Sequence, residues 1–452
     1  MIHEGMADFD VLVIGGGNGG QGAALRTAKA GKKTALVDKG EVGGLCALRG
    51  CNPKKVMVRA SEVLDEVRRA HVHGITTGPV SIEWSKVVDR LHTFTDPIPA
   101  QTEASLKKAG VTRLRGVARF VAPDRIAVDG RELSADTFVI ATGSRARALP
   151  VPGGELCAIS DDIFDVRVPP RRMVIIGAGV VGLEFGFVFA RLGTEVTIVE
   201  AKGEPLGGEV DADFAAPILA HGEQLGIRWA WNQSVRAVKR AGAQFAVELG
   251  DRTLEADYVL NAIGRTAAVE ELDLAMAGVR GDAKGIEVDD YLCSPHNPRV
   301  YAAGDAHGRW QLSPIASYEG RVIARNIITP RSSKVDYTAL PRAVFTTPTI
   351  AMVGITEAEA KRRGIAVDAV TNDMTHWKVH GILGDELARA KTVVDKSTGK
   401  LLGAQLCAPS AGDTIHVFAF AMRAGMTRDQ LQDLVYAYPT PSSALASTFT
   451  QY

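Results

Sequence analysis

The residues most able to do chemistry are two cysteines, Cys46 and Cys51, which are separated by four residues. Four intervening residues fit a single helical turn, which would hold the sulfurs close enough to bridge, because a disulfide needs Cα atoms roughly 4.4–6.8 Å apart. Pro53 can open a helix just after the pair. Lys54 and Lys55 follow at once, and a cation beside a thiol favours the reactive thiolate. The pattern predicts a redox pair, and two unpaired buried cysteines are the alternative that the rest of the chain has to exclude.

The composition excludes several classes of protein. Of 452 residues, 46% are hydrophobic and 23% are charged, and the formal net charge is zero, so no electrostatic footprint for nucleic acid is present. The length predicts roughly two to four domains. The acidic start lacks a secretory signal, and five sparse cysteines do not suggest a disulfide-stapled secreted protein. No apolar stretch reaches the length of about 20 residues that a membrane span needs. We therefore expect a soluble, cytoplasmic protein with no membrane or nucleic-acid partner.

A glycine-rich turn near the start predicts a first nucleotide site. The apolar run 10–14 is typical of a buried parallel strand, and the alanine-rich segment through Ala30 favours a helix. A second strand is expected over 34–38 and ends in Asp38, which can bind a ribose diol. Between the first strand and the helix, the glycines of a G-x-G-x-x-G turn are Gly15, Gly17 and Gly20. They let the backbone turn tightly, approach a pyrophosphate and pack the helix on the strand, so the whole unit indicates a dinucleotide.

The same unit recurs further along the chain. The apolar run 173–176 precedes the turn, a helix is expected through about Leu192, and the strand 195–200 ends in Glu200. The glycines of this turn are Gly177, Gly179 and Gly182. In both units the last glycine lies 18 residues before the acid. Two such sites suggest a flavin on one unit and a nicotinamide on the other. A carboxylate at the strand end binds the free 2′-hydroxyl of NAD and repels the 2′-phosphate of NADP. NAD is therefore favoured, and Lys202 keeps NADP open.

With these motifs together, the chain resembles the pyridine nucleotide-disulfide oxidoreductases, the flavoprotein family of dihydrolipoamide dehydrogenase, glutathione reductase and mercuric reductase. The resemblance covers nearly the whole chain and includes four further motifs. They are the exit from the flavin domain at 141–144, the return crossing at 262–265, the second flavin motif at 300–305 and the start of the dimerisation domain over 342–357.

The resemblance implies an α/β fold with two Rossmann-like dinucleotide-binding domains, for FAD and NAD(P), and a C-terminal α+β dimerisation domain. The expected domains are 1–148 (first part of the FAD domain), 149–265 (NAD(P) domain), 266–335 (second part of the FAD domain) and 340–452 (dimerisation domain). A homodimer with a site shared across its interface is expected.

The resemblance also implies which residues bind the two cofactors. The Asp of the second flavin motif would hydrogen-bond the ribityl chain. The expected set is Gly15, Gly17, Gly20, Asp38, Lys39, Gly116, Ala118, Thr142, Gly143, Ser144, Gly177, Gly179, Gly182, Glu200, Gly264, Arg265, Gly304, Asp305 and Ser313.

In the mechanism that the resemblance implies, hydride passes from NADH to the flavin, which then opens a Cys46–Cys51 disulfide. Cys46 is the interchange thiol that attacks the substrate, and Cys51 contacts the flavin as the charge-transfer thiolate. One of Lys54 and Lys55 would lie near flavin N5 and pair with Glu184. For Glu184, the alternative is a solvated helix residue. The implied activity is NAD(P)H-dependent reduction of a small disulfide or another thiol-reactive acceptor.

The chain departs from the family at its acid–base residue. Disulfide reductases of the family carry His-x-His-Pro-Thr, followed three residues later by Glu. Here Tyr438 takes the position of the second histidine and Ser443 that of the glutamate. A phenol, with an ordinary pKa of about 10, is a poorer proton shuttle at neutral pH than an imidazole. We therefore predict an atypical catalytic Tyr438, which would reach Cys46 of the partner subunit.

This departure leaves other functions open. Mercuric reductases share the tyrosine but also have a C-terminal cysteine pair, whereas no cysteine follows Cys407 here. The alternatives are a flavin-dependent NAD(P)H reductase of quinones or metal ions, and a dihydrolipoamide dehydrogenase-like subunit of a larger complex. No metal site is expected, because the remaining cysteines lack metal-ligand spacing and are interpreted as structural or incidental. A lone histidine is usually packed or solvated, so none is favoured as a substitute base; those considered are His307, His376, His380 and His416.

Overall fold

The computed structural model describes residues 7–450, and the chain divides into two compact units. Unit 1 is formed by the described part of Met1–Lys54 together with Asp89–Arg147 and Gly264–Asp336. Unit 2 is formed by Lys55–Val88, Ala148–Ile263 and the described part of Tyr337–Tyr452. Within residues 7–450, no helix combines the length and the apolar character that crossing a membrane requires.

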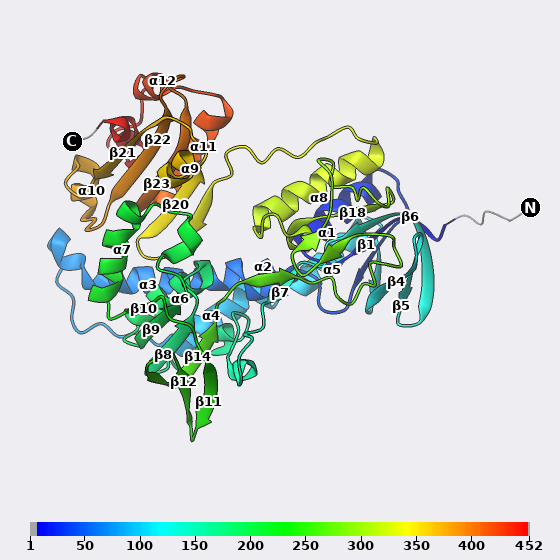
Figure 1. Ribbon diagram of the computed structural model, residues 1–452, viewed down its shortest axis with the longest axis horizontal. Helices are drawn as coiled ribbons and strands as arrows, with labels where there is room; N and C mark the ends of the chain where they lie inside the picture. Colours follow the sequence, from blue (N-terminus) through cyan, green and yellow to red (C-terminus); the bar gives the residue numbers. More distant parts are fainter. Residues whose placement is uncertain (1–6, 451–452) are drawn as a thin grey trace, which may run out of the picture. The chain divides into compact units, whose positions relative to one another are not determined.

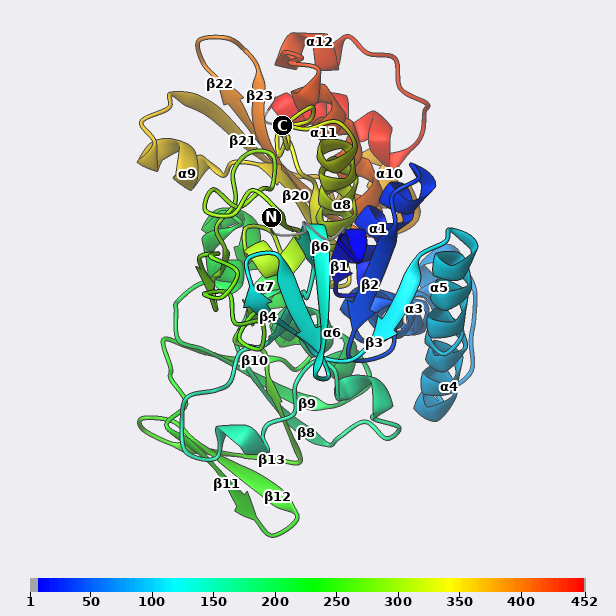
Figure 2. The ribbon, with the colours of Figure 1, turned by 90° about the vertical axis from the view of Figure 1, so that its right-hand side faces the viewer.

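Unit 1 is built on a seven-stranded sheet in which the central strands are parallel (Figure 2). A glycine-rich turn joins the first strand to helix α1 (Asn18–Lys29), and Gly31, at φ +83°, follows the end of that helix. The predicted strands and helix are therefore present, within one or two residues of their expected ends. The order of the sheet is β3 (Thr112–Arg115), β2 (Thr34–Asp38), β1 (Phe9–Ile14), β6 (Arg131–Ile140), β5 (Arg125–Val128) and β4 (Ala118–Ala122), with β18 (Val300–Ala302) beside β6.

Helices α1 and α8 (Ser313–Ile328) lie side by side on one face of this sheet (Figure 1). Two glycines allow the close approach, because a Cβ added at Gly22 would lie 3.4 Å from the Cα of Gly320. Alanines and valines of α1, α8 and the sheet fill the interface between them. On the opposite face, β4 and β5 at the end of this sheet fold back, and their side chains pack against those of β1, β2 and β6. As a result, the N-termini of α1 and α8 lie at the carboxyl edge of the parallel strands.

Unit 2 repeats the same strand order in a smaller parallel sheet. Its order is β10 (Arg228–Trp231), β9 (Glu195–Glu200), β8 (Arg172–Ile176) and β14 (Tyr258–Asn261). Helices α6 (Val180–Arg191) and α7 (Ala212–Gln224) cover one face, where Gly186 lies against Ile198 and Gly222 against Trp229. The other face packs against a ribbon of β11 (Ala237–Ala241), β12 (Gln244–Glu248) and β13 (Thr253–Ala256).

The C-terminal part of unit 2 is a five-stranded antiparallel sheet covered by helix α11 (Ala411–Arg423) and the 3₁₀ helix η6 (Pro441–Phe449). Its strand order is β19 (Arg342–Val344), β20 (Thr349–Gly354), β23 (Leu401–Ala408), β22 (Arg389–Asp395) and β21 (Val367–Asp373). Lys391 of β22 is buried among the carboxylates of Asp211, Asp213 and Glu357, at 3.4, 2.7 and 2.9 Å. This ion cluster ties the C-terminal sheet to α7 inside unit 2.

The remaining elements are short or connect the larger ones. In unit 1 they are α2 (Gly44–Arg49), α5 (Ile98–Lys108), β7 (Ser144–Ala146), β15 (Arg265–Ala267), β16 (Gly281–Asp282), β17 (Gly285–Ile286) and η5 (Gly304–His307). In unit 2 they are η1 (Ala70–His73), η2 (Gly154–Leu156), η3 (Ile163–Asp165), η4 (Pro205–Gly208), α9 (Glu357–Arg362), α10 (Lys378–Leu383) and α12 (Arg428–Gln432). Two helices, α3 (Cys51–Arg68) and α4 (Trp84–Thr95), contain the boundaries between the units.

Candidate functional site

The first glycine turn has the geometry of a phosphate cradle. Gly15 has φ +109°, and a Cβ there would lie 2.2 Å from the carbonyl oxygen of Ala141. A Cβ at Gly20 would lie 1.9 Å from the carbonyl oxygen of Gly15, so the helix can pack on the turn only without side chains. Gly17 at the start of α1 is different, because the nearest atom to its added Cβ is the Cα of Gly44 at 3.7 Å. The first N–H groups of α1 can therefore be approached by a phosphate.

Asp38 closes this cradle at the end of β2. One of its carboxylate oxygens accepts the N–H of Gly16 at 2.6 Å and the other accepts the N–H of Gly40 at 2.9 Å. The carboxylate is thus fixed beside the glycine turn, where it can meet a ribose.

Two other predicted cofactor residues have different surroundings. Lys39 forms an exposed ion pair with Glu271, and Ala118 is buried in the core between the sheet and the ribbon. Gly116, at φ +147°, donates its N–H to the carbonyl of Asp38 at 3.2 Å.

A second group of predicted residues meets where the chain leaves the sheet after β6. The Ser144 hydroxyl donates to Asp305 at 2.5 Å and accepts from Arg265 Nε at 2.8 Å. Arg265 also donates from Nη2 to the carbonyl of Ser144 at 2.9 Å. Burial raises the pKa of the Asp305 carboxyl, against the lowering effects of Ser144 and Arg265. Gly143 and Gly264, at φ +73° and +108°, form the turns that bring these strands together.

The structure adds a buried pair beneath Asp305 that sequence reasoning missed. Glu319 of α8 is fully buried and accepts the N–H of Gly304 at 2.6 Å with one carboxylate oxygen. Its other oxygen lies 2.9 Å from Nε2 of the buried His307. The pair fixes both ends of the short helix η5 and so positions Asp305 between them. The local signal for it was a glutamate followed directly by Gly320 and then by the apolar residues Val322 and Ile323 of α8.

The unit 1 site also fits the flavin that the sequence implies. The hydroxyl oxygen of Thr142 is buried, and it finds no hydrogen-bond partner among the residues that the structure describes. It belongs to the turn that packs against Gly15, beside the open approach to Gly17. A polar atom in this position suits a polar ligand laid along the carboxyl edge of the sheet. Thr142, Asp38, Asp305 and the turn around Gly17 are the groups that would hold FAD.

The second glycine turn repeats the first in detail. Gly177 has φ +109°, and a Cβ at Gly182 would lie 1.9 Å from the Gly177 carbonyl oxygen, the same distance as in unit 1. No atom lies within 4 Å of a Cβ added at Gly179. Glu200 accepts the N–H of Ala178 at 2.8 Å and that of Lys202 at 2.9 Å. These residues would hold the pyrophosphate and adenosine ribose of a nicotinamide dinucleotide.

The two cysteines lie on two different helices, which corrects the expectation of a single helical turn. Cys46 is in α2, and Cys51 is the first residue of α3, with a break at Gly50 between them. A Cβ at Gly50 would lie 2.9 Å from the carbonyl oxygen of Leu45, so a glycine fits this break. No disulfide joins Cys46 and Cys51 in this structure.

The surroundings of Cys46 favour its thiolate. The pKa of the Cys46 thiol is lowered to about 6, chiefly by a hydrogen bond from the Cys51 thiol. The Ser313 hydroxyl, the backbone N–H of Cys51 and the charge of Lys54 act in the same direction, while burial opposes them. The backbone N–H belongs to the first residue of α3, so the sulfur lies at the positive end of an 18-residue helix. Cys46 is therefore largely ionised at neutral pH.

The lysines after the pair have separate environments. Lys54 contributes to lowering the pKa of Cys46, so its charge lies near the thiols of unit 1. Lys55 instead forms an ion pair with Glu62 at 3.1 Å, and its ammonium lies 4.2 Å from the centre of the Phe345 ring. Glu184 of α6 is buried and accepts the N–H of Phe345 at 2.9 Å. The alternative of a solvated Glu184 was wrong.

The predicted base position is exposed within a single chain. The Tyr438 side chain is 68% exposed and follows α12 in an irregular segment. Ser443 has a structural task, because its hydroxyl accepts the N–H of Thr440 at 3.2 Å and its own N–H bonds the Thr440 hydroxyl at 3.2 Å. These two bonds form a capping box at the start of η6. Ser443 is therefore used to begin a helix.

The remaining cysteines and histidines do not form a second reactive site. Burial raises the pKa of Cys157 to about 11 and also raises that of Cys293 and Cys407. His380 is buried and its Nδ1 lies 2.8 Å from Asp385, whereas His416 is exposed and stacks on Phe420. His376 is exposed. Over residues 7–450, no three His, Cys, Asp or Glu side chains come together as metal ligands.

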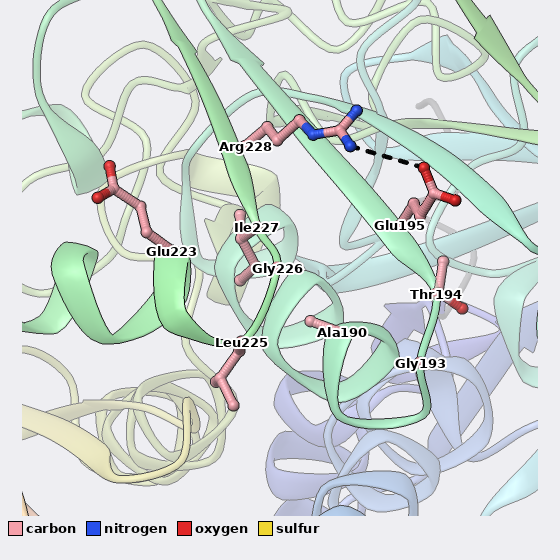
Figure 3. Close-up of a pocket in the computed structure, with 9 residues that line it drawn as sticks. All are labelled: Ala190, Gly193, Thr194, Glu195, Glu223, Leu225, Gly226, Ile227 and Arg228. Atoms are coloured by element: carbon pink, nitrogen blue, oxygen red, sulfur yellow. Dashed lines mark ion pairs between the residues drawn. The ribbon is translucent and has the colours of Figure 1, made fainter.

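A surface cavity of about 320 Å³ lies in unit 2 (Figure 3). It is bordered by the end of α6, the end of α7 and the first residues of β9 and β10, where Arg228 and Glu195 form an ion pair at 3.7 Å. The glycine turn around Gly179 follows the opposite, carboxyl end of the strands. None of the predicted cofactor or catalytic residues lines this cavity.

The fold, the two thiols of unit 1 and the dinucleotide cradle in each unit indicate a flavoprotein disulfide oxidoreductase. The family model described as pyridine nucleotide-disulphide oxidoreductase matches residues 9–320, and the model of that family's dimerisation domain matches residues 340–448. The chain therefore belongs to the pyridine nucleotide-disulphide oxidoreductase family. The predicted family, α/β fold and enzyme class are confirmed.

Relatives and solved structures agree with this assignment. Dihydrolipoyl dehydrogenases from Geobacillus stearothermophilus and Chlamydia muridarum are 33% and 31% identical, and their alignments cover 97% of this chain and 95% and 96% of the relatives. A mercuric reductase from Bacillus cereus is 31% identical, over 98% of this chain and 71% of its own length. The HOCl-induced flavoprotein disulfide reductase RclA from Escherichia coli superposes with a TM-score of 0.88 at 25% identity, covering 97% of this chain and 99% of RclA.

The two classes of glycine in the second cradle should respond differently to substitution. We expect Gly179→Ala to fold normally, because its methyl group meets open space, and to weaken NADH binding about tenfold or more by entering the phosphate position. Gly182→Ala should instead lower stability, by roughly 1–3 kcal/mol or more, because its methyl group would overlap the Gly177 carbonyl. Thermal melts and fluorescence titration with NADH measure both effects. Equal loss of stability in the two variants would contradict this assignment.

The thiols should also differ in their pH response. In the reduced protein, alkylation of Cys46 by iodoacetamide should rise through a midpoint near pH 6 and be almost constant above neutrality, because the thiolate is the reacting form. Cys157 is the internal control, with a midpoint near pH 11. Peptide mass spectrometry reads both sites in one sample. A Cys46 midpoint near that of an ordinary thiol, about 8.5, would refute the described hydrogen bonding.

Proposed function

We propose that this enzyme uses NADH to reduce a disulfide, or another thiol-reactive acceptor, through the Cys46–Cys51 pair. The single observation that carries the proposal is the arrangement of these thiols, with Cys46 held as a thiolate at the start of α3 by Cys51. Bound FAD would supply the hydride and electron chemistry that connects NADH to the two sulfurs. The three domains expected from the sequence, with the FAD domain in two segments, belong to the same proposal, as do the cofactor residues and a cytoplasmic homodimer.

The thiol chemistry follows from the different states of the two sulfurs. The Cys46 thiolate would attack one sulfur of a disulfide, forming a mixed disulfide and releasing the other half as a thiolate that takes up a proton. Cys51 would then lose its proton and attack the Cys46 sulfur, which releases the second thiol and closes the Cys46–Cys51 disulfide. The acceptor gains two electrons from the enzyme pair and two protons, one that Cys51 releases and one from the solvent. A low pKa at Cys46 suits the attacking role.

The residue at the end of β9 supports NAD as the nicotinamide cofactor. Glu200 is oriented by two backbone N–H groups at the end of β9, where a carboxylate favours a free 2′-hydroxyl over a phosphate. Lys202 keeps NADP as the second candidate.

We assign the lysine beside the flavin and the thiols to Lys54, because Lys55 already contacts Glu62 and Phe345. Glu184, buried on α6, is kept as its proposed partner.

Tyr438 is the proposed acid–base residue of the partner subunit's thiols. Its exposed side chain lies in the segment that matches the family's dimerisation domain, so it is free to meet a second copy of the chain. The absent histidine and glutamate favour an acceptor whose reduction needs little proton shuttling. This is the observation that keeps metal ions and quinones as alternative acceptors, and it also keeps a role as a subunit of a larger complex open. Mercuric reductases among the relatives support the metal-ion alternative.

The first test of the proposal follows the two thiols separately. Anaerobic titration with NADH should produce a long-wavelength absorption band from contact between the Cys51 thiolate and the flavin. Cys51→Ser should remove the band, whereas Cys46→Ser should retain it and lose disulfide reduction. Absence of the band in the parent protein would reject the proposed use of the thiols. Full turnover of quinones or metal ions by Cys46→Ser would instead establish the alternative function.

A second test restores the family's usual acid–base pair. The double variant Tyr438→His with Ser443→Glu should increase dihydrolipoamide turnover on the order of a hundredfold, because general acid–base catalysis typically contributes at least that much. The fold should accept the change, since a glutamate three residues after Thr440 completes a favoured capping box. Tyr438→Phe and Ser443→Glu alone are the controls. An unchanged rate in the folded double variant would show that Tyr438 is not at the thiols.

A further inference from the structure

Helix α10 exposes apolar residues and buries a polar pair, whereas a surface helix usually turns its apolar side inward. Ile382 and Leu383 face solvent, and Ile382 is 60% exposed. On the buried side lies His380, whose Nδ1 is 2.8 Å from the carboxylate of the buried Asp385. The helix therefore cannot rotate to bury Ile382 and Leu383 without also separating this pair.

A second apolar segment, distant in the sequence, lies against the end of α10. The carbonyl oxygen of Gly384 accepts a hydrogen bond from Arg69 Nη1 at 2.9 Å. A Cβ added at Gly384 would lie 3.1 Å from Cγ1 of Val72, which belongs to η1. Val72 is 50% exposed, and every residue from 71 to 79 is exposed, including Ile75. Both segments belong to unit 2, so they adjoin each other within one compact part of the chain.

These two segments form one apolar surface, here called the η1–α10 patch, which consists of Val72, Ile75, Ile382 and Leu383. Single exposed apolar residues are common, but several from two adjoining segments mark an interaction surface. The guanidinium of Arg69, which connects the two segments, is already paired with Asp65 at 3.0 Å. The patch therefore fits an apolar partner surface better than a charged one.

We propose that a second copy of this chain covers the η1–α10 patch, so that the dimer interface extends from the dimerisation domain onto η1. This inference rests on the homodimer of the proposed function. Helix α10 lies within residues 340–448, which match the family's dimerisation domain, so its exposed apolar side is continuous with the surface that meets the partner. A partner that covers Ile382 also reaches Val72, because η1 lies against the end of α10. Since η1 follows α3, the helix that begins at Cys51 would end at the interface.

The test measures dimerisation of the FAD-loaded protein by analytical ultracentrifugation over a range of concentrations. Val72→Glu and Ile382→Glu should each raise the dimer dissociation constant on the order of a hundredfold, because each places an unpaired charge at an apolar contact. Val168→Glu is the matched control, since Val168 is 79% exposed but lies between η3 and β8, outside the patch. This variant should dimerise as the parent does. All three positions are exposed within a single chain, so the fold should accept the changes, and flavin absorbance verifies it.

Hydrogen exchange gives a second measurement on the interface itself. In the parent dimer, the backbone amides of residues 71–79 should exchange about tenfold more slowly than in monomeric Ile382→Glu. The reason is that the partner would exclude water from η1 and the segment after it. The substituted residue lies outside this segment, so the comparison reports on contact with the partner.

The outcomes separate this inference from the proposed function. A parent dimer whose dissociation constant is unchanged in both patch variants would overturn the inference and leave the homodimer standing. Equal weakening of the dimer by Val168→Glu would also overturn it. A parent protein that stays monomeric at every concentration would overturn both the inference and the homodimer. Neither measurement requires turnover, so both are independent of the charge-transfer band and the Cys46→Ser activity that test the thiol chemistry.

Discussion

The site depends on one change of chain direction, the break between α2 and α3 at Gly50. Without it, Cys46 and Cys51 would lie on one continuous helix, and the backbone N–H of Cys51 would be bonded inside that helix. The break leaves this N–H at the start of α3, where it and the Cys51 thiol both bond the Cys46 sulfur. A glycine fits because the carbonyl oxygen of Leu45 comes within 2.9 Å of where a Cβ would be. The packing around Gly50 thus determines which groups bond the sulfur of Cys46.

The two dinucleotide cradles show how strongly backbone contacts constrain a repeated unit. In each, the last glycine of the turn packs against the carbonyl oxygen of the first, with the same 1.9 Å distance to an added Cβ. In each, the acid at the end of the second strand is bonded by an N–H group of the turn. The acids are therefore oriented before any ribose arrives, which reduces the ordering cost of binding.

The proposed acid–base chemistry of this protein differs from the histidine–glutamate pattern expected of its family. The position of the usual glutamate is a serine that caps η6, and the position of the usual histidine is an exposed tyrosine. A histidine–glutamate pair does occur in unit 1, between His307 and Glu319, but it is buried and holds the turn that carries Asp305. The ionisation of Cys46 relies on Cys51, Ser313 and the start of α3. A thiol that is already ionised needs less help from an external base.

The sequence alone determined the parts of this protein that depend on local rules. Glycine spacing, apolar runs and terminal acids predicted β1, α1, β2 and their counterparts in unit 2 almost to the residue, because steric limits and hydrophobic periodicity act over a few positions. The spacing of the two cysteines also predicted the redox pair, whereas the departure at Tyr438 was recognised only through the resemblance to the family. Only the tertiary structure showed the break between the cysteines, the separate surroundings of Lys54 and Lys55, and the burial of Glu184. It also joined Glu319 to His307 and placed η1 beside α10. These contacts arise when distant helices pack together, so no local pattern in the chain encodes them.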